Sequence, residues 1–282
     1  MKTVRIIGVP EHFNLPWHLA MEEGAFAERG IDLIWTDIPE GTGKMSEMLK
    51  QNETDLAIIL TEGVIKSISN GNPVKILQEY VSSPLLWGIH VRRDSPHLSV
   101  SDLENAEIAI SRMGSGSHLM ATVHAKKMGW DINALCFKII NNLEGALKDF
   151  SDGSDAYFMW EHFTTKPWVD NGILKRLGDF PTPWPCFVVV ATQTFITKNR
   201  GLLDHILEVI NTYTLEFKSI PSIDRTLSNR YEQKLEDIRN WLSKTRWGQN
   251  QLKEDTLYEV QTQLKHLNLI EEIKPADNFL ID

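Results

Sequence analysis

Residues 4–9 read Val-Arg-Ile-Ile-Gly-Val, and residues 31–37 read Ile-Asp-Leu-Ile-Trp-Thr-Asp. Both stretches are short and rich in β-branched residues, so both predict β-strands. Between them, residues 15–29 predict a helix that is punctuated by Gly24 and Gly30. A strand, a helix and a second strand in this order form a βαβ unit, which predicts a parallel sheet covered by helices.

The same alternation continues along the chain and predicts two lobes. Further strands are expected at residues 56–60, 74–80, 86–91, 107–111, 137–140, 156–160 and 187–192. Further helices are expected at residues 44–51, 63–70, 117–128, 143–150, 202–217, 230–244 and 252–267. The apolar strands near residues 84–93 and 184–194 are interpreted as two hinge strands. We therefore predict a two-lobed α/β fold with a mostly parallel sheet in each lobe; lobe 1 comprises residues 1–88 and 190–282, and lobe 2 comprises residues 89–189.

Composition excludes several function classes. The net charge of −9 and the scattered Lys and Arg residues argue against a nucleic-acid partner. No stretch offers the roughly 18 apolar residues of a membrane-spanning helix, so no membrane insertion is expected. The two cysteines, Cys136 and Cys186, have no metal-ligand spacing, and neither a metal nor a cofactor is predicted. The start of the chain has no signal-peptide pattern, which predicts a cytoplasmic protein if the chain is full length and a periplasmic or lipid-anchored one if a signal was removed.

Three motifs, in consistent order, carry a family resemblance. The first is Pro16-x-x-x-Ala20-x-x-x-Gly24-x-Phe26-x-x-x-Gly30-Ile31-Asp32-Leu33, the second is Gly114-Ser115-Gly116-Ser117-His118, and the third is Asp155-Ala156-x-x-x-Trp160-Glu161. Together they resemble the type 2 periplasmic solute-binding proteins for alkanesulfonates, nitrate and thiamine-pyrimidine precursors, and the related eukaryotic thiamine pyrimidine synthase-like proteins. The resemblance implies two α/β lobes that close a cleft on a small-molecule ligand, with an ABC permease as the protein partner.

The chain departs from the enzyme branch of that resemblance. The lysine and histidine which the synthase uses after its third strand fall at Ile59 and Gly63, and its cysteine cluster is represented at most by Cys186. Neither a Ser-His-Asp order nor a zinc-protease motif is present. We therefore expect no catalytic residues, while a cytoplasmic cofactor-biosynthesis enzyme on the same fold remains the alternative.

The first candidate binding residues follow the first two strands. His12, Asn14 and Trp17 stand in a polar and aromatic loop that enters a helix, where backbone N–H groups and ring faces are available to a ligand. The competing interpretation is that Asn14 caps the helix and Trp17 packs. Thr42 follows the second strand within Gly41-Thr42-Gly43-Lys44, which is not a phosphate loop because its flanking pattern is missing.

The second candidate group is the turn that contains Ser115, Gly116, Ser117 and His118. Glycine allows close approach of the backbone to a ligand, and serine hydroxyls at the start of a helix favour an acceptor or an anion. The competing interpretation is a tight strand-to-helix turn in which Ser115 serves only as the cap. The position of this turn within the resemblance favours ligand contact.

The third group consists of Glu62, Trp160, Glu161 and Trp184. Both acids follow apolar strands, and burying an acid is costly unless it meets a donor. An amine-bearing heteroaromatic ligand would supply that donor, and the tryptophans would cover its ring. The competing interpretation is that each acid caps the following helix or meets solvent. The sequence thus predicts a binding protein for a small polar or heteroaromatic molecule, such as a thiamine-pyrimidine precursor, over a sulfonate.

Overall fold

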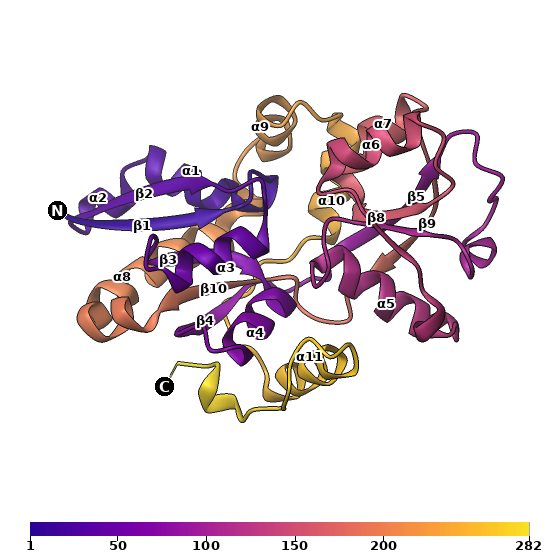
Figure 1. The fold of residues 1–282 in the computed structure, drawn as a ribbon. Helices are drawn as coiled ribbons and strands as arrows, with labels where there is room; N and C mark the ends of the chain where they lie inside the picture. Colours follow the sequence, from indigo (N-terminus) through magenta and orange to yellow (C-terminus); the bar gives the residue numbers. More distant parts are fainter. Residues whose placement is uncertain (282) are drawn as a thin grey trace. The chain divides into compact units, whose positions relative to one another are not determined.

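The computed structural model describes residues 1–281, which divide into two compact units. Unit 1 comprises Met1–Ser83 together with the chain from Trp184 onward, and unit 2 is Pro84–Pro183. Each unit holds one five-stranded sheet with helices packed against it (Figure 1). The predicted α/β class with two sheets is therefore confirmed.

The sheet of unit 1 has the strand order β2-β1-β3-β10-β4. Its strands are β1 (Lys2–Gly8), β2 (Ile31–Asp37), β3 (Leu56–Leu60), β4 (Val74–Val81) and β10 (Phe187–Thr192). Strand β1 pairs in parallel with β2 and β3, whereas β10 pairs antiparallel with β3 and β4. Four strands thus run in one direction, and their carboxyl ends share one edge of the sheet.

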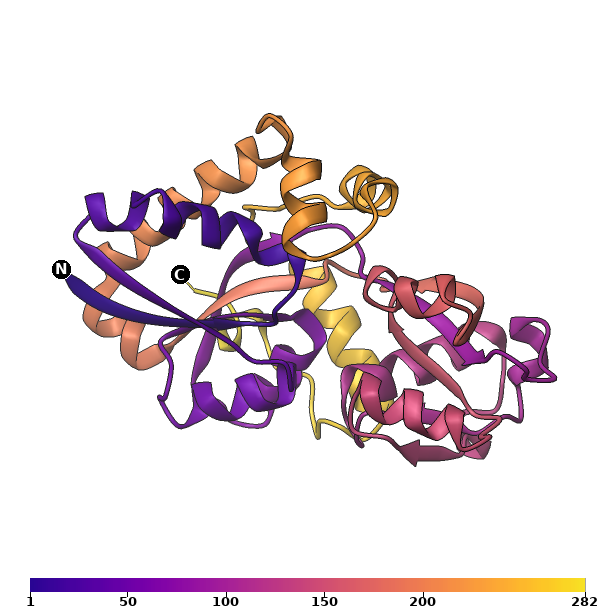
Figure 2. The same ribbon diagram turned by 90° about the horizontal axis from the view of Figure 1, so that it is seen from above.

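Two groups of helices cover this sheet. The helical segments are η1 (His12–Asn14), α1 (Leu15–Glu22), α2 (Ala25–Glu28), α3 (Thr42–Lys50), α4 (Thr61–Ser69), α8 (Gln193–Glu216), η4 (Phe217–Ser219), α9 (Ile223–Arg230), α10 (Leu235–Lys244), α11 (Glu254–His266) and η5 (Ala276–Asn278). Helices α1 and α2 pack against α8, and α3 and α11 pack against α4. Figure 2 shows α1 and α8 on one side of the sheet and α3 and α4 on the other.

Local backbone geometry explains where these helices differ from the sequence prediction. The single helix expected at residues 15–29 is divided into α1 and α2, because Gly24 adopts a left-handed conformation with φ of 77°. The helix expected from residue 230 begins at Leu235, after a turn in which Glu232 has φ of 51°.

The outer strand of the unit 1 sheet, β4, is covered by the C-terminal part of the chain. The Glu79 N–H donates to the Asn250 carbonyl at 2.8 Å, and the Ile76 N–H donates to the Phe279 carbonyl at 2.7 Å. These contacts satisfy backbone groups that an exposed edge would leave open to pairing with other chains. The C-terminal segment is therefore an integral part of unit 1.

The sheet of unit 2 repeats this arrangement with the order β7-β6-β8-β5-β9. Its strands are β5 (Leu86–Arg92), β6 (Ile108–Ile110), β7 (Phe137–Ile139), β8 (Tyr157–Glu161) and β9 (Leu174–Pro181). Its helices are η2 (Val100–Leu103), α5 (Gly116–Met128), η3 (Ile132–Ala134), α6 (Leu143–Ser151) and α7 (His162–Asp170). Strand β5 is the reversed member, antiparallel to β8 and β9.

The unit boundaries lie a few residues before the predicted limits of lobe 2, 89–189. The predicted limits fall inside β5 and β10, but each of these strands belongs wholly to one sheet. Leu86 already pairs with Pro181 of β9, and Phe187 already pairs with Leu60 of β3. The chain therefore passes from unit 1 to unit 2 between residues 83 and 84, and returns between residues 183 and 184.

Three findings concern residues 1–281 as a whole. Within this range, the helices are too short or too polar to cross a membrane. The same residues contain no group of three or more His, Cys, Asp or Glu side chains arranged to hold a metal ion. Both cysteines are free thiols, with Cys136 exposed and Cys186 buried.

Candidate ligand-binding site

Six of the sequence-predicted binding residues lie at the carboxyl edge of the unit 1 sheet. They stand in the segments that follow β1, β2 and β3 or precede the antiparallel β10, and these segments meet at one edge. The six residues are His12, Asn14, Trp17, Thr42, Glu62 and Trp184. All but Thr42 are buried, with at most 2% of the residue exposed. The architecture thus gathers these side chains at one place in unit 1.

Glu62 and Trp184 form a direct pair at this edge. The Trp184 indole N–H donates to Oε2 of Glu62 at 2.8 Å. The other carboxylate oxygen, Oε1, is buried and has no hydrogen-bond partner within residues 1–281. Burial raises the pKa of Glu62, although the hydrogen bond from Trp184 opposes that rise. Glu62 therefore offers one further hydrogen-bonding position beside an indole ring.

His12 lies against a tryptophan that is not among the sequence-predicted binding residues. Its ring centroid is 4.1 Å from that of Trp241 on α10, and the two ring planes are tilted by 44°. Burial lowers the pKa of His12 to about 3, so its imidazole is neutral at pH 7. His12 Nε2 and Trp241 Nε1 are both buried, and neither has a hydrogen-bond partner in the described chain.

Asn14 and Trp17 each combine a structural contact with an open polar atom. The Asn14 amide donates to the Val9 carbonyl at 2.8 Å, which holds the loop after β1, and it makes no side-chain cap on α1. Trp17 stacks on Phe26 with ring centroids 5.8 Å apart. Yet Asn14 Oδ1 and Trp17 Nε1 are buried without a partner among the residues described here.

The carboxyl edge of unit 1 thus contains five buried polar atoms that have no hydrogen-bond partner among residues 1–281. They belong to His12, Asn14, Trp17, Glu62 and Trp241. Leaving one such group unsatisfied costs about 1–3 kcal/mol, and buried polar groups in native proteins are ordinarily hydrogen-bonded. Their concentration at the edge where α/β folds bind ligands marks this edge as the strongest candidate site.

The predicted turn in unit 2 has a different character, because its polar groups satisfy one another. Ser117 Oγ accepts from the Ser111 N–H at 2.9 Å and lies 3.0 Å from Ser115 Oγ. Ser115 caps α5 by accepting from the His118 N–H, and His118 Nδ1 accepts from the Gly114 N–H at 2.9 Å. Gly116 is the first residue of α5. The structure brings these residues together as a hydrogen-bonded strand-to-helix turn.

Trp160 and Glu161 also have partners inside unit 2. Trp160 stacks on Phe158 with centroids 5.2 Å apart and packs against an apolar cluster that includes Ala109 and Phe150. Glu161 Oε2 accepts from the Thr164 N–H at 2.6 Å and so caps α7. Burial raises the pKa of Glu161, and these backbone donors oppose the rise. Glu161 therefore caps the helix that follows it, as the competing interpretation of the sequence proposed.

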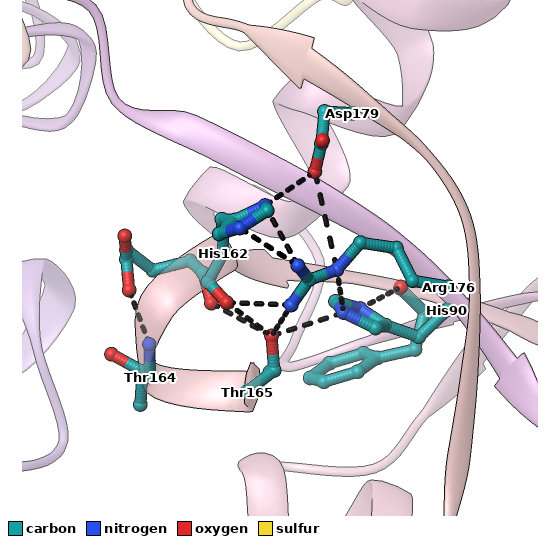
Figure 3. Close-up of polar contacts among 8 residues, drawn as sticks. His90, His162, Thr164, Thr165, Arg176 and Asp179 are labelled. Carbon is teal, nitrogen blue, oxygen red and sulfur yellow. Dashed lines mark hydrogen bonds and ion pairs between the residues drawn. The ribbon is translucent and has the colours of Figure 1, made fainter. Parts of the chain in front are cut away.

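A polar network next to this cap was missing from the sequence-based site. Figure 3 shows Arg176 of β9 between His162 and Thr165 of α7 and His90 of β5. The Arg176 guanidinium donates to His90 Nε2 at 3.1 Å, to His162 Nε2 at 2.8 Å and to the His162 carbonyl at 2.6 Å. Asp179 Oδ1 completes the network at 2.7 Å from His162 Nδ1.

The network sets the charge state and the tautomer of His90. Burial and the neighbouring Arg176 charge lower the pKa of His90 to about 3, so His90 is neutral. With its proton on Nδ1, His90 donates to the Phe158 carbonyl, and its Nε2 accepts from Arg176 and from Thr165. Burial would raise the pKa of Asp179, but His162 and Arg176 outweigh it and the pKa is lowered. We interpret this network as the anchor of α7 on β5 and β9.

Gly63, the position at which the synthase's histidine would fall, is packed closely against Thr42. A Cβ atom at Gly63 would lie 2.1 Å from Cγ2 of Thr42. We expect Gly63→Ala to lower the free energy of unfolding by about 1 kcal/mol, since the steric cost exceeds the gain in helix propensity. Thr42→Ser removes the obstructing methyl and should restore the loss. Urea denaturation of the two single variants and the double variant measures this coupling, and additive losses would contradict it.

Comparisons with known proteins agree with this architecture. Residues 87–180 match the family model described as Ca3427-like PBP, where PBP denotes periplasmic binding protein. The solved structure of the conserved CA3427 gene product of Candida albicans superimposes with a TM-score of 0.87 at 26% identity, covering 97% of this chain and 92% of that chain. That protein is described as exhibiting the generic periplasmic-binding-protein fold. Among proteins with curated descriptions, none matches this sequence.

Sulfonate-binding proteins share the same fold. The alkanesulfonate-binding protein SsuA of Xanthomonas axonopodis pv. citri, bound to MOPS, has a TM-score of 0.81 at 14% identity, covering 98% of this chain and 97% of that chain. The periplasmic aliphatic sulphonate-binding protein SsuA of Escherichia coli has a TM-score of 0.75 at 16% identity, covering 100% of this chain and 92% of that chain. The predicted resemblance to type 2 periplasmic binding proteins is thereby confirmed, and the chain has their fold.

Proposed function

We propose that this protein binds one small molecule at the carboxyl edge of the unit 1 sheet, and that the molecule donates a hydrogen bond to Glu62. The observation that carries the proposal is the state of the Glu62 carboxylate. It is 1% exposed, one oxygen accepts from Trp184, and the other has no partner within residues 1–281. A ligand donor at Oε1 would remove an unfavourable burial.

The chemistry of this pair favours an amine-bearing heteroaromatic ligand. An exocyclic amine or an amidine-like edge donates to a carboxylate, and the ring of Trp184 offers an aromatic face next to it. A sulfonate is an anion that only accepts hydrogen bonds, so it cannot donate to Glu62. The partner of Glu62 is an indole rather than a cation, so this pair supplies no positive charge to balance a sulfonate. An amino-pyrimidine of the thiamine-precursor type is therefore our proposed ligand class, in contrast to the sulfonates named for the SsuA proteins.

Two cellular settings follow from the same binding site. If the protein is exported, it delivers its ligand to an ABC-type permease; if it stays in the cytoplasm, it holds the ligand for a soluble acceptor. Fractionation of native host cells separates the two, because recovery with periplasmic markers supports delivery to a permease and recovery with cytosolic markers supports the second setting.

Calorimetric titration tests the proposed ligand class. We expect the hydroxymethyl aminopyrimidine precursor of thiamine to bind more tightly than ethanesulfonate. Glu62→Gln should weaken binding of the pyrimidine at least about tenfold, because it replaces an acceptor with a donor where the ligand donates. Glu79→Gln is the matched control: Glu79 is also buried in unit 1 with a raised pKa, but it stands on the outer strand β4.

Two results would overturn the assignment. One is tighter binding of the sulfonate than of the pyrimidine by the wild-type protein. The other is equal weakening by Glu62→Gln and Glu79→Gln. Native mass spectrometry of protein purified from its own host supplies an independent reading, because a co-purified molecule carrying a sulfonate and no amine would contradict the proposal directly.

A further inference from the structure

His12 and Trp241 form a polar pair in unit 1 that the contact between Glu62 and Trp184 does not involve. His12 is 2% exposed and Trp241 is 1% exposed, and their ring centroids are 4.1 Å apart. His12 Nε2 and Trp241 Nε1 are buried with no hydrogen-bond partner among residues 1–281. Two adjacent rings thus carry two unsatisfied nitrogen atoms, although the rings themselves are well packed.

The surroundings of the pair are aromatic. The ring of Phe13 lies 5.2 Å from His12 and 5.1 Å from Trp241, and Tyr231 lies 5.8 Å from His12. Trp247 meets Trp241 edge to face at 5.8 Å. These residues supply a low-polarity wall, in which each hydrogen bond gained or lost has more weight than in water.

The chemistry of the two nitrogen atoms limits what the pair can bind. An indole N–H only donates, so the partner of Trp241 must be an acceptor. The imidazole of His12 is neutral at pH 7 because burial lowers its pKa to about 3, so Nε2 accepts when the proton is on Nδ1. A group that accepts from one nitrogen and donates to the other matches the pair, and a hydroxyl group is the smallest one that does both.

The pair and Glu62 lie at the same edge of the unit 1 sheet. Phe13, which contacts both His12 and Trp241, also packs against Phe187 with ring centroids 5.3 Å apart. Phe187 pairs with Leu60 in the sheet, and Leu60 is two residues before Glu62. A continuous path of contacts therefore joins the aromatic pair to the β3 end that carries Glu62.

We propose that His12 and Trp241 form a subsite for a neutral hydroxyl group of the ligand, with Trp241 as donor and His12 as acceptor. The inference rests on the proposed function, because it places a second group of the same ligand beside the one that meets Glu62. It adds a requirement which Glu62 alone does not impose: the ligand carries an amine and a hydroxyl. A carboxylate or sulfonate cannot donate to His12, and it would also bring a charge into an apolar setting.

A pair of ligands that differ only at the hydroxyl tests the subsite. We would measure the affinity of the hydroxymethyl aminopyrimidine and of its analogue in which a methyl replaces the hydroxymethyl. The hydroxyl should improve binding by about tenfold or more, because its loss leaves two buried nitrogen atoms unpaired. Trp241→Phe keeps an aromatic ring but removes the donor, so it should reduce this ratio toward one.

A spectroscopic readout identifies the atom involved. In protein labelled with ¹⁵N at tryptophan, the Trp241 indole signal is the one that disappears in Trp241→Phe. The hydroxymethyl compound should shift this signal, and the methyl analogue should leave it in place. The ligand ratio is measured on the wild-type protein alone, so this part of the test stands even if Trp241→Phe folds poorly.

The outcomes separate this inference from the proposed function. Equal affinity for the two pyrimidines, with Glu62→Gln still weakening both, would overturn the hydroxyl subsite and leave the proposed function intact. If neither pyrimidine binds, the proposed ligand class fails, and a methanol titration followed at the Trp241 signal then decides the subsite. A saturable shift that His12→Phe abolishes would support it, and an unmoved signal would overturn it.

Discussion

Arg176→Met is expected to lower the free energy of unfolding by about 3 kcal/mol, because it removes one partner from a largely buried charged network. The Arg176 and His162 side chains are each 12% exposed. Without the guanidinium, His162 Nε2 and the His162 carbonyl lose donors, and the Asp179 carboxylate loses a neighbouring positive charge. Urea denaturation followed by circular dichroism measures the loss.

Arg92→Met is the matched control within unit 2. Arg92 forms an ion pair with Asp155 at 2.8 Å, but these side chains are 26% and 53% exposed. Exposed ion pairs contribute about 0–1 kcal/mol, so the control should stay close to the wild type. Similar losses in the two variants would contradict the view that the network anchors α7. Because Arg176 belongs to unit 2, an unfolding curve with two transitions should show the loss in only one of them.

Acid should destabilise the wild-type protein more than His12→Phe, by about 2 kcal/mol between pH 7 and pH 5. In the folded protein, burial holds the pKa of His12 at about 3, whereas the ordinary value is 6.5. As the pH falls through 6.5, the unfolded chain takes up a proton that the folded chain does not, so stability is lost. Below about pH 3 both states are protonated at this residue and the loss levels off.

The comparison with the variant isolates His12 from other groups that titrate in acid. Buried Glu62 and Glu161 have raised pKa values, so they take up protons more readily when folded and act in the opposite direction. These contributions cancel in the difference between the wild type and His12→Phe. Phe26→Leu, a change without a titrating group in the same unit, should shift stability equally at both pH values. A pH-independent difference for His12→Phe would show that His12 has the same pKa in the folded and the unfolded chain, which would contradict the prediction.

The sequence allowed the fold class to be predicted because apolar strands and helices alternate clearly. Residues 187–192 were expected as a strand and form β10. Strand β9, Leu174–Pro181, was missed: its sequence Leu-Lys-Arg-Leu-Gly-Asp-Phe-Pro places charged residues and a glycine where apolar alternation is expected. Those charged residues have a structural reason, since Arg176 and Asp179 belong to the network around His162.

The candidate site was only partly accessible from the sequence. Glu62 was selected because it follows an apolar strand and Trp184 because its ring could cover a ligand, and the structure joins them by a hydrogen bond. Trp241 was not selected, since nothing in the sequence places it against His12, 229 positions earlier. Long-range ring contacts of this kind depend on tertiary packing, which one sequence does not reveal.

The insertion of β10 between β3 and β4 has a consequence for the order in which the chain matures on the ribosome. Unit 2 is one uninterrupted segment, so it can complete its sheet as soon as residue 183 has emerged. The sheet of unit 1 cannot be completed at that stage, because β3 and β4 both pair with β10, Phe187–Thr192, which has not yet emerged. Throughout synthesis of unit 2, these two strands lack their shared central neighbour and expose edges that attract other chains. We therefore expect the N-terminal segment to stay open to pairing with other chains until Phe187–Thr192 has emerged.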